Sequence, residues 1–270
     1  MEKMEQDKDK IKTVIFGSDS IEFGWAVSTW IPAMRFAARR FKRVVAVCNE
    51  RNRYLYEDFA TDFEFYEQKG KHDMWYVGRR PDILPKVPKR IRRKYEGATY
   101  YVPSRNKCLD WPRLYHRYGM PDPGKKYDLV IHARAETKYE QTDRNWPVEY
   151  YEMMLRLLDK PMRICSIGTK AHHIPGTDDL RGIDLKSLCD ILTSSCLCIG
   201  PSSGPMHLAH ACACPILVWT DWKKQRAIKT TNRVRYLKLW RANDSQVTIY
   251  DSEDWQPQPR SIANKIKELL

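Results

Sequence analysis

The chain has 270 residues, of which 42% are hydrophobic and 30% are charged, so it can bury the core of one large or two small domains. No apolar run approaches the roughly 20 residues that a membrane-spanning helix needs. The charged start, MEKMEQDKDKIK, has no apolar segment typical of a secretory signal. These features predict a cytoplasmic protein without a transmembrane helix, in the host cytoplasm if the chain is viral.

The eight cysteines fit a reducing compartment. Four of them form two C-x-C pairs, Cys196 with Cys198 and Cys212 with Cys214. Structural zinc sites usually separate paired cysteines by two or more residues, and both pairs lie in apolar runs. We therefore interpret them as small buried thiols and expect no metal.

The net charge of +13 is uneven along the sequence. Residues 1–125 carry 26 Lys/Arg against 17 Asp/Glu, and the excess peaks in residues 79–117, where 12 basic side chains face three acids. Five aromatic residues are interleaved with them. Clustered cations attract phosphates and aromatic rings stack on bases or sugars, so this stretch favours a polyanionic partner over an ordinary solvated face.

Short β-rich apolar runs alternate with segments of helical spacing. The runs lie at 13–16, 43–48, 127–132, 162–168, 196–200 and 215–219. Strands alternating with helices predict an α/β fold with parallel sheets flanked by helices. Pro and Gly interrupt the pattern at 118–126. We therefore expect a Rossmann-like N-terminal domain over 1–122, a second over 123–257 and a C-terminal helix over 258–270.

One segment, CIGPSSGPMHLAHACACPILVW (198–219), reads as a strand, a tight loop, a helix and another strand. The loop would place free backbone N–H groups and the hydroxyls of Ser202 and Ser203 at a helix N-terminus. Pro205 suits the first helical turn because its φ is preset. Such an N-terminus binds anions and can hold a diphosphate without a metal, although a serine there can also be a simple N-cap.

This segment closely resembles the donor-binding segment of the heptosyltransferase-like (glycosyltransferase family 9-like) glycosyltransferases, whose pattern runs G-x-[DS]-[ST]-G-x-x-H-x-A-x-A-x-x-x-P. The resemblance spans about 127–222, since DLVIHARAETKYEQTDRNWPVEYYEMMLRLLD, MRICSIGT and LRGIDLKSLCDILTSSCLCIG match its elements in order. It implies the GT-B arrangement of two facing Rossmann-like domains. It also implies metal-independent, inverting transfer of a sugar from a nucleotide diphosphate sugar.

The resemblance implies roles for individual residues. The loop and helix start that grip the donor match Ser202, Ser203, Gly204 and His207. Basic contacts to the diphosphate match Arg144, in RNWP, and Arg134, after the strand that ends in IHA. The donor ribose would be held by an acid before LKSL, for which Asp178 and Asp179 are the nearest candidates.

In the family, the catalytic base is a carboxylate on the first βα loop. Here the expected position falls near Ala26, which cannot accept a proton. Glu22 and Asp19 lie upstream on the same loop, and we favour Glu22 as the base, with Asp19 second. The neighbouring FGSDSIEFG lacks the G-x-G-x-x-G spacing of a dinucleotide-binding oxidoreductase.

The acceptor in such enzymes is handled by the N-terminal domain, where the basic stretch lies. We expect it to contact the acceptor through Arg90, Arg92, Arg93, Lys94, Tyr95 and Trp111. Hydroxymethylated DNA of the bacteriophage type is slightly favoured as the acceptor. A lipopolysaccharide or other phosphorylated glycan is the alternative, as is a non-catalytic nucleic-acid-binding module derived from a transferase.

Overall fold

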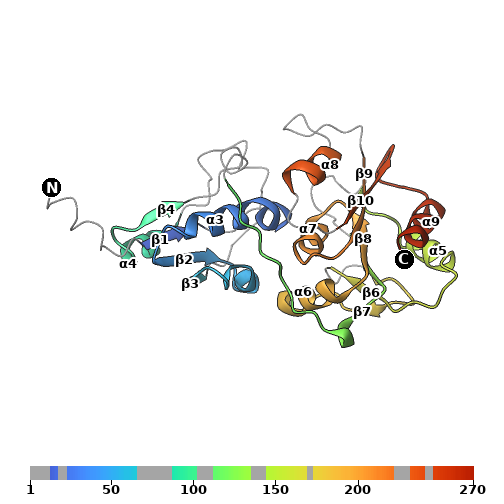
Figure 1. The fold of residues 1–270 in the computed structure, drawn as a ribbon, viewed down its shortest axis with the longest axis horizontal. Helices are drawn as coiled ribbons and strands as arrows, with labels where there is room; N and C mark the ends of the chain where they lie inside the picture. The colour runs from blue at the N-terminus through green and yellow to red at the C-terminus, as the bar shows by residue number, and fades with distance from the viewer. Residues whose placement is uncertain are drawn as a thin grey trace. The chain divides into compact units, whose positions relative to one another are not determined.

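The computed structural model describes residues 13–17, 23–65, 87–101, 112–134, 144–168, 173–221, 232–240 and 246–270. The chain divides into two compact units, Met1–Tyr115 and His116–Leu270, each built on its own sheet (Figure 1). Every described strand pair in both sheets is parallel. The expected fold class, parallel sheets flanked by helices in two Rossmann-like units, is confirmed.

Unit 1 contains a four-stranded sheet in the order β3-β2-β1-β4. Its elements are β1 (Thr13–Phe16), α2 (Phe23–Trp25), the π-helical turn η1 (Ala26–Trp30), α3 (Ile31–Ala38), β2 (Arg43–Cys48), the 3₁₀ helix η2 (Glu50–Tyr56), β3 (Asp62–Phe65), α4 (Lys89–Lys94) and β4 (Thr99–Tyr101). The apolar run at 43–48 is buried from its second residue onward, as expected for a strand covered on both faces.

Helix α4 covers one face of the unit 1 sheet. Ile91 of α4 and Tyr95, which follows it, pack against Ile15 of β1 and Val45 and Val47 of β2. The alternation of these strand residues places their neighbours on the opposite face. The only apolar side chain within α4 thus points into the core, and its five cations are left exposed.

Unit 2 contains a six-stranded sheet in the order β10-β9-β8-β5-β6-β7. Its elements are the 3₁₀ turn η5 (Pro123–Lys125), β5 (Leu129–His132), α5 (Val148–Arg156), β6 (Ile164–Ile167), β7 (Asp178–Asp179), α6 (Leu185–Ser194), β8 (Leu197–Pro201), α7 (Gly204–Ala211), β9 (Ile216–Asp221), α8 (Asn232–Val234), the π-helical turn η7 (Arg235–Leu239), β10 (Val247–Ser252) and α9 (Pro259–Leu269). Figure 1 shows α6 and α7 on one side of this sheet and α5 and α9 on the other.

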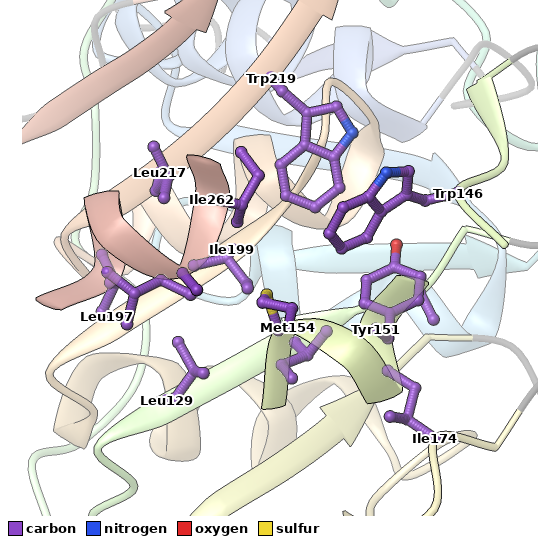
Figure 2. Packing of buried hydrophobic residues seen from close by; sticks show 14 residues of the cluster. Leu129, Trp146, Tyr151, Met154, Ile174, Leu197, Ile199, Leu217, Trp219 and Ile262 are labelled. Atoms are coloured by element: carbon purple, nitrogen blue, oxygen red, sulfur yellow. The ribbon is translucent and has the colours of Figure 1, made fainter. Parts of the chain in front are cut away.

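The main core of unit 2 lies between the sheet and helices α5 and α9 (Figure 2). Trp146 packs in this core with ring centroids 4.7 Å from Tyr151 and 5.0 Å from Trp219. Its indole N–H donates to the carbonyl of Pro257 at 2.9 Å. Edge-to-face aromatic pairs add about 0.5–1.5 kcal/mol each beyond simple burial. This packing fixes the start of α5 and the residues just before it.

The structure divides the chain slightly before the expected boundary after residue 122. The segment that follows Tyr115 is bound to unit 2: the Tyr118 N–H donates to Ala211, and the Met120 N–H donates to the buried carboxylate of Asp190 at 2.8 Å. The C-terminal helix is α9, which packs on α5 as part of unit 2.

Gly119 lies in this segment with a positive φ of 84°, and a Cβ there would lie 2.2 Å from the carbonyl oxygen of Cys189. Gly176 has a similar φ of 80° but open space around it, so it is a matched control. Gly176→Ala should lower the free energy of unfolding by about 1 kcal/mol, for the left-handed backbone alone. Gly119→Ala should lower it by about 3 kcal/mol or more in urea denaturation. Equal losses in the two variants would show that segment 116–122 is not packed as described.

Candidate active site

The end of β8 leads directly into α7 at the carboxyl edge of the unit 2 sheet. Gly200 lies close to the end of β5, because a Cβ there would be 2.9 Å from the carbonyl oxygen of His132. The Ser202 N–H donates to the Trp219 carbonyl at 3.1 Å, which holds the turn against β9. In parallel α/β sheets, ligands bind at this edge, where strands end and helices begin.

Ser203 is the N-cap residue of α7, but its side chain makes no capping hydrogen bond. Its hydroxyl oxygen is buried and has no partner among the described residues. Pro205 occupies the first turn, as the sequence predicted. The free N–H groups of the turn and the Ser203 hydroxyl are therefore available to an anion.

An aromatic wall covers the first turn of α7. His207 stacks on Tyr236 with centroids 5.0 Å apart, and its ring meets Trp240 edge-on at 4.5 Å. The Tyr236 hydroxyl donates to Ser202 Oγ at 3.2 Å. Burial lowers the pKa of His207 from 6.5 to about 3, so this imidazole is neutral near pH 7.

Tyr236 lies in η7 and Trp240 follows it directly, in a stretch to which sequence reasoning assigned no role. Arg233 forms an ion pair with Asp251, which ties α8 to β10. Arg235, by contrast with the exposed Arg233, is buried, and its guanidinium lies 5.6 Å from the centre of the Trp240 ring. Tyr236 and Trp240 are four residues apart, a spacing that predicts two aromatic rings on one face of a helix but not the surface on which they pack.

The two predicted basic residues of unit 2 lie near each other. Arg134 follows the end of β5 and donates to Asn145 Oδ1 at 2.6 Å, beside Arg144. Arg144 is buried, and its guanidinium lies 4.5 Å from the Trp255 ring. No carboxylate in the described part of the chain forms an ion pair with it. Because β5 neighbours β8, Arg134 leaves the sheet at the same edge as Ser202.

Asp178 and Asp179 lie elsewhere, on the edge strand β7, which β5 and β6 separate from β8. Asp178 accepts from the Tyr127 hydroxyl at 3.0 Å. Asp179 accepts two hydrogen bonds from Arg181, and these hold its pKa well below its usual value. Both carboxylates thus have partners within unit 2, and their role toward a ribose stays a prediction.

The predicted acceptor residues on α4 are partly engaged with a single acid. Glu64 of β3 accepts from Lys94 at 2.7 Å and from the Tyr95 hydroxyl at 3.0 Å, and Arg90 lies 3.8 Å away. Burial alone would raise the pKa of Glu64, but these hydrogen bonds lower it below its usual value. Arg92 donates to the Val87 carbonyl and lies over the Tyr100 ring, and Arg93 is exposed.

Three predicted site residues, Glu22, Asp19 and Trp111, lie outside the described residues. Ala26 is described: it is buried in η1, directly after the short helix that starts at Phe23. Gly204, expected in the donor-binding loop or helix start, is the first residue of α7.

Among the described residues, no group of three or more His, Cys, Asp or Glu side chains is arranged to hold a metal ion. The described cysteines, Cys198 and Cys212 among them, are free thiols, and burial raises the pKa of both. Within the same residues, no helix combines the length and the hydropathy needed to cross a membrane.

Two Rossmann-like units, each built on a parallel sheet flanked by helices, match the GT-B fold class, and comparison with solved glycosyltransferase structures supports this assignment of the fold. The chain is similar to ADP-heptose lipopolysaccharide heptosyltransferase II of Escherichia coli, with a TM-score of 0.61 and 13% identity over 96% of this chain and 98% of that one. It is also similar to the Escherichia coli heptosyltransferase WaaC with ADP, with a TM-score of 0.57 and 12% identity over 96% and 100% of the chains.

A family 9 glycosyltransferase from Veillonella parvula is similar as well, with a TM-score of 0.58 and 11% identity over 96% of this chain and 90% of that one. No protein-family model and no curated protein sequence matches the chain. The resemblance to heptosyltransferase-like enzymes is thus confirmed in the fold, across nearly the whole chain.

The depressed histidine pKa predicts how stability depends on pH. Unfolded His207 binds a proton below about pH 6.5, whereas the folded protein resists protonation until about pH 3. Stability should therefore fall on acidification through this window, by at most about 1.4 kcal/mol per pH unit for this group. In urea denaturation between pH 7 and 4.5, His207→Gln should be less stable at pH 7 but lose less on acidification.

If His207→Gln lost as much stability on acidification as the wild type does, the imidazole would not be buried and neutral as described.

Proposed function

We propose that this chain is a glycosyltransferase that moves a sugar from a nucleotide diphosphate sugar to a hydroxyl of an anionic acceptor. The observation that carries the proposal is the start of α7, where a buried Ser203 hydroxyl with no partner among the described residues lies beside the first N–H groups of the helix, at the carboxyl edge of the sheet. The fold of heptosyltransferases, one of them bound to ADP, supports the same conclusion.

The donor diphosphate would lie at this helix N-terminus. When the bond between the sugar carbon and the diphosphate oxygen breaks, negative charge develops on the leaving diphosphate. Fixed N–H dipoles and guanidinium groups stabilise that charge without reorganising. Arg144 suits this task because its fork can donate to two phosphate oxygens at once, and Arg134 lies beside it. No metal is needed for this stabilisation.

His207 would serve the donor as a neutral group. Its ring stacks on Tyr236 and meets Trp240 edge-on, and burial keeps it unprotonated near neutral pH. It can therefore orient a ligand by a hydrogen bond, whereas the positive charge comes from arginine.

The acceptor hydroxyl oxygen attacks the sugar carbon as the diphosphate leaves, which inverts the configuration at that carbon. The hydroxyl proton passes to a carboxylate. The resemblance assigns this base to the loop after β1, and Glu22 is our first candidate, with Asp19 second.

We favour hydroxymethylated DNA as the acceptor because unit 1 carries the excess of positive charge. A phosphorylated glycan such as lipopolysaccharide is the second candidate, since two of the similar structures are heptosyltransferases. A binding module without catalysis is the third, because Ala26 occupies the position expected for the acid.

Donor binding is tested by thermal unfolding with ADP, UDP and GDP. At least one diphosphate should raise the melting temperature, as any ligand that binds only the folded state does. Arg144→Gln should weaken its binding roughly tenfold to a hundredfold, through loss of a charged hydrogen-bonding partner. Arg260→Gln, which removes an exposed cation on α9, is the matched control and should bind as the wild type does. Unchanged melting with all three diphosphates would remove the basis of the proposal.

Transfer itself is tested with hydroxymethylcytosine DNA and a panel of nucleotide sugars, followed by digestion and mass measurement of the nucleosides. We expect a nucleoside heavier by one sugar, and a loss of at least about 100-fold in rate for Glu22→Gln or Asp19→Asn. Glu96→Gln, at an exposed acid of unit 1, should retain the rate. Transfer only to a phosphorylated glycan would select the second acceptor, and DNA binding without any transfer would select the non-catalytic module.

A further inference from the structure

A band of exposed cations crosses the amino ends of the strands in unit 1. We call it the basic rim, and it comprises two segments that are distant in the sequence. One is the turn between α3 and β2 together with the first residue of β2, and the other is the end of α4. Its members are Arg39, Arg40, Lys42, Arg43, Arg92, Arg93 and Lys94.

The two segments meet at one aromatic ring. The Arg43 guanidinium lies 5.2 Å from the centre of the Tyr95 ring, and the Lys94 ammonium lies 5.3 Å from the same centre. The ring itself is buried against β1 and β2. The Tyr95 ring therefore brings one cation of each segment, Arg43 and Lys94, close to each other.

Acids neutralise only part of the rim. Asp62 accepts two hydrogen bonds from Arg43, and Glu64 accepts from Lys94. In the part of the chain that the structure describes, no carboxylate forms an ion pair with the remaining rim arginines. These arginines, Arg39, Arg40, Arg92 and Arg93, are exposed. The rim thus keeps an excess of positive charge in solution.

The rim lies at the opposite edge of the sheet from the predicted catalytic loop. Arg43 pairs with Thr13 at the amino end of β1, whereas Phe16 and Gly17 at the other end lead toward Asp19 and Glu22. A strand of four residues separates the edges by about 13 Å. A polymer held at the rim must therefore extend well past the bound segment to reach the loop.

We propose that the basic rim is a docking surface for the phosphate backbone of double-stranded DNA, separate from the site of sugar transfer. The choice of DNA rests on the proposed function, but the docking surface does not require transfer. The only apolar side chain of α4, Ile91, is fully buried, so the helix offers charge and no apolar face. Surface binding to a membrane uses exposed aromatic and aliphatic side chains, whereas backbone phosphates need cations and favour arginine forks.

The test measures binding of the full chain to an unmodified DNA duplex of about 20 bp over a range of salt concentrations. Log affinity should fall linearly with log salt concentration. The variants R92Q/R93Q and R39Q/R40Q should each bind more weakly and lower that slope by about 1 for each phosphate contact removed. K126Q/R260Q, which removes two exposed cations from unit 2, should keep the wild-type slope.

Vesicle binding and stabilisation by a nucleoside diphosphate are measured on the same variants. Vesicles of phosphatidylglycerol report a membrane role: binding to them that both rim variants lose, without DNA binding, would overturn the proposal. Unchanged DNA affinity and slope in both rim variants would overturn it as well. Stabilisation by a nucleoside diphosphate, measured on the same variants, should be unaffected. If no diphosphate stabilised the protein while the rim variants still weakened DNA binding, the proposed function would fail and the docking surface would stand.

Discussion

The close approach of β8 to β5 at Gly200 is the constraint on which the candidate site depends. A Cβ at this position would lie 2.9 Å from the His132 carbonyl oxygen, so the backbone of the neighbouring strand leaves no room for a side chain, and 3.1 Å from Met206 Sδ, which would have to shift slightly. This contact fixes the position of the end of β8 relative to β5, and therefore the point at which the chain turns into α7. It also brings the end of β5 beside that turn, so that Arg134 and the α7 N–H groups emerge at one edge. The site therefore requires glycine at position 200.

The sequence predicted the parts of unit 2 whose signals are local. The β-rich runs at 127–132, 196–200 and 215–219 became β5, β8 and β9, and Pro205 marked the first turn of α7. The aromatic wall was missed because its members become neighbours of α7 only in the folded chain. Tyr236 reaches Ser202 across 34 positions, and nothing in the RVRYLKLW segment identifies that partner.

The density of charge along the sequence did not show which cations of α4 are paired or which other segment lies beside them. Arg92, Arg93 and Lys94 are consecutive, yet Lys94 is paired with Glu64 while its two neighbours form no ion pair with any described residue. Their partners on the rim come from the α3–β2 turn, about fifty residues earlier. No window of the sequence contains both segments, because the crossover topology of a parallel sheet joins them only after folding.

At the candidate donor loop, the group that can titrate, His207, is neutral, and the positive charge belongs to groups that do not titrate near pH 7. Burial keeps His207 neutral, so the imidazole contributes shape and a hydrogen bond. The positive potential comes from guanidinium groups and helix N–H dipoles, which keep their charge throughout the physiological pH range. Donor binding then needs no protonation event on the protein. A protein group that changes charge during transfer is required only on the acceptor side, where the hydroxyl proton has to leave. In the proposed function, anion recognition therefore belongs to unit 2, and the resemblance implies that the base for proton transfer belongs to unit 1.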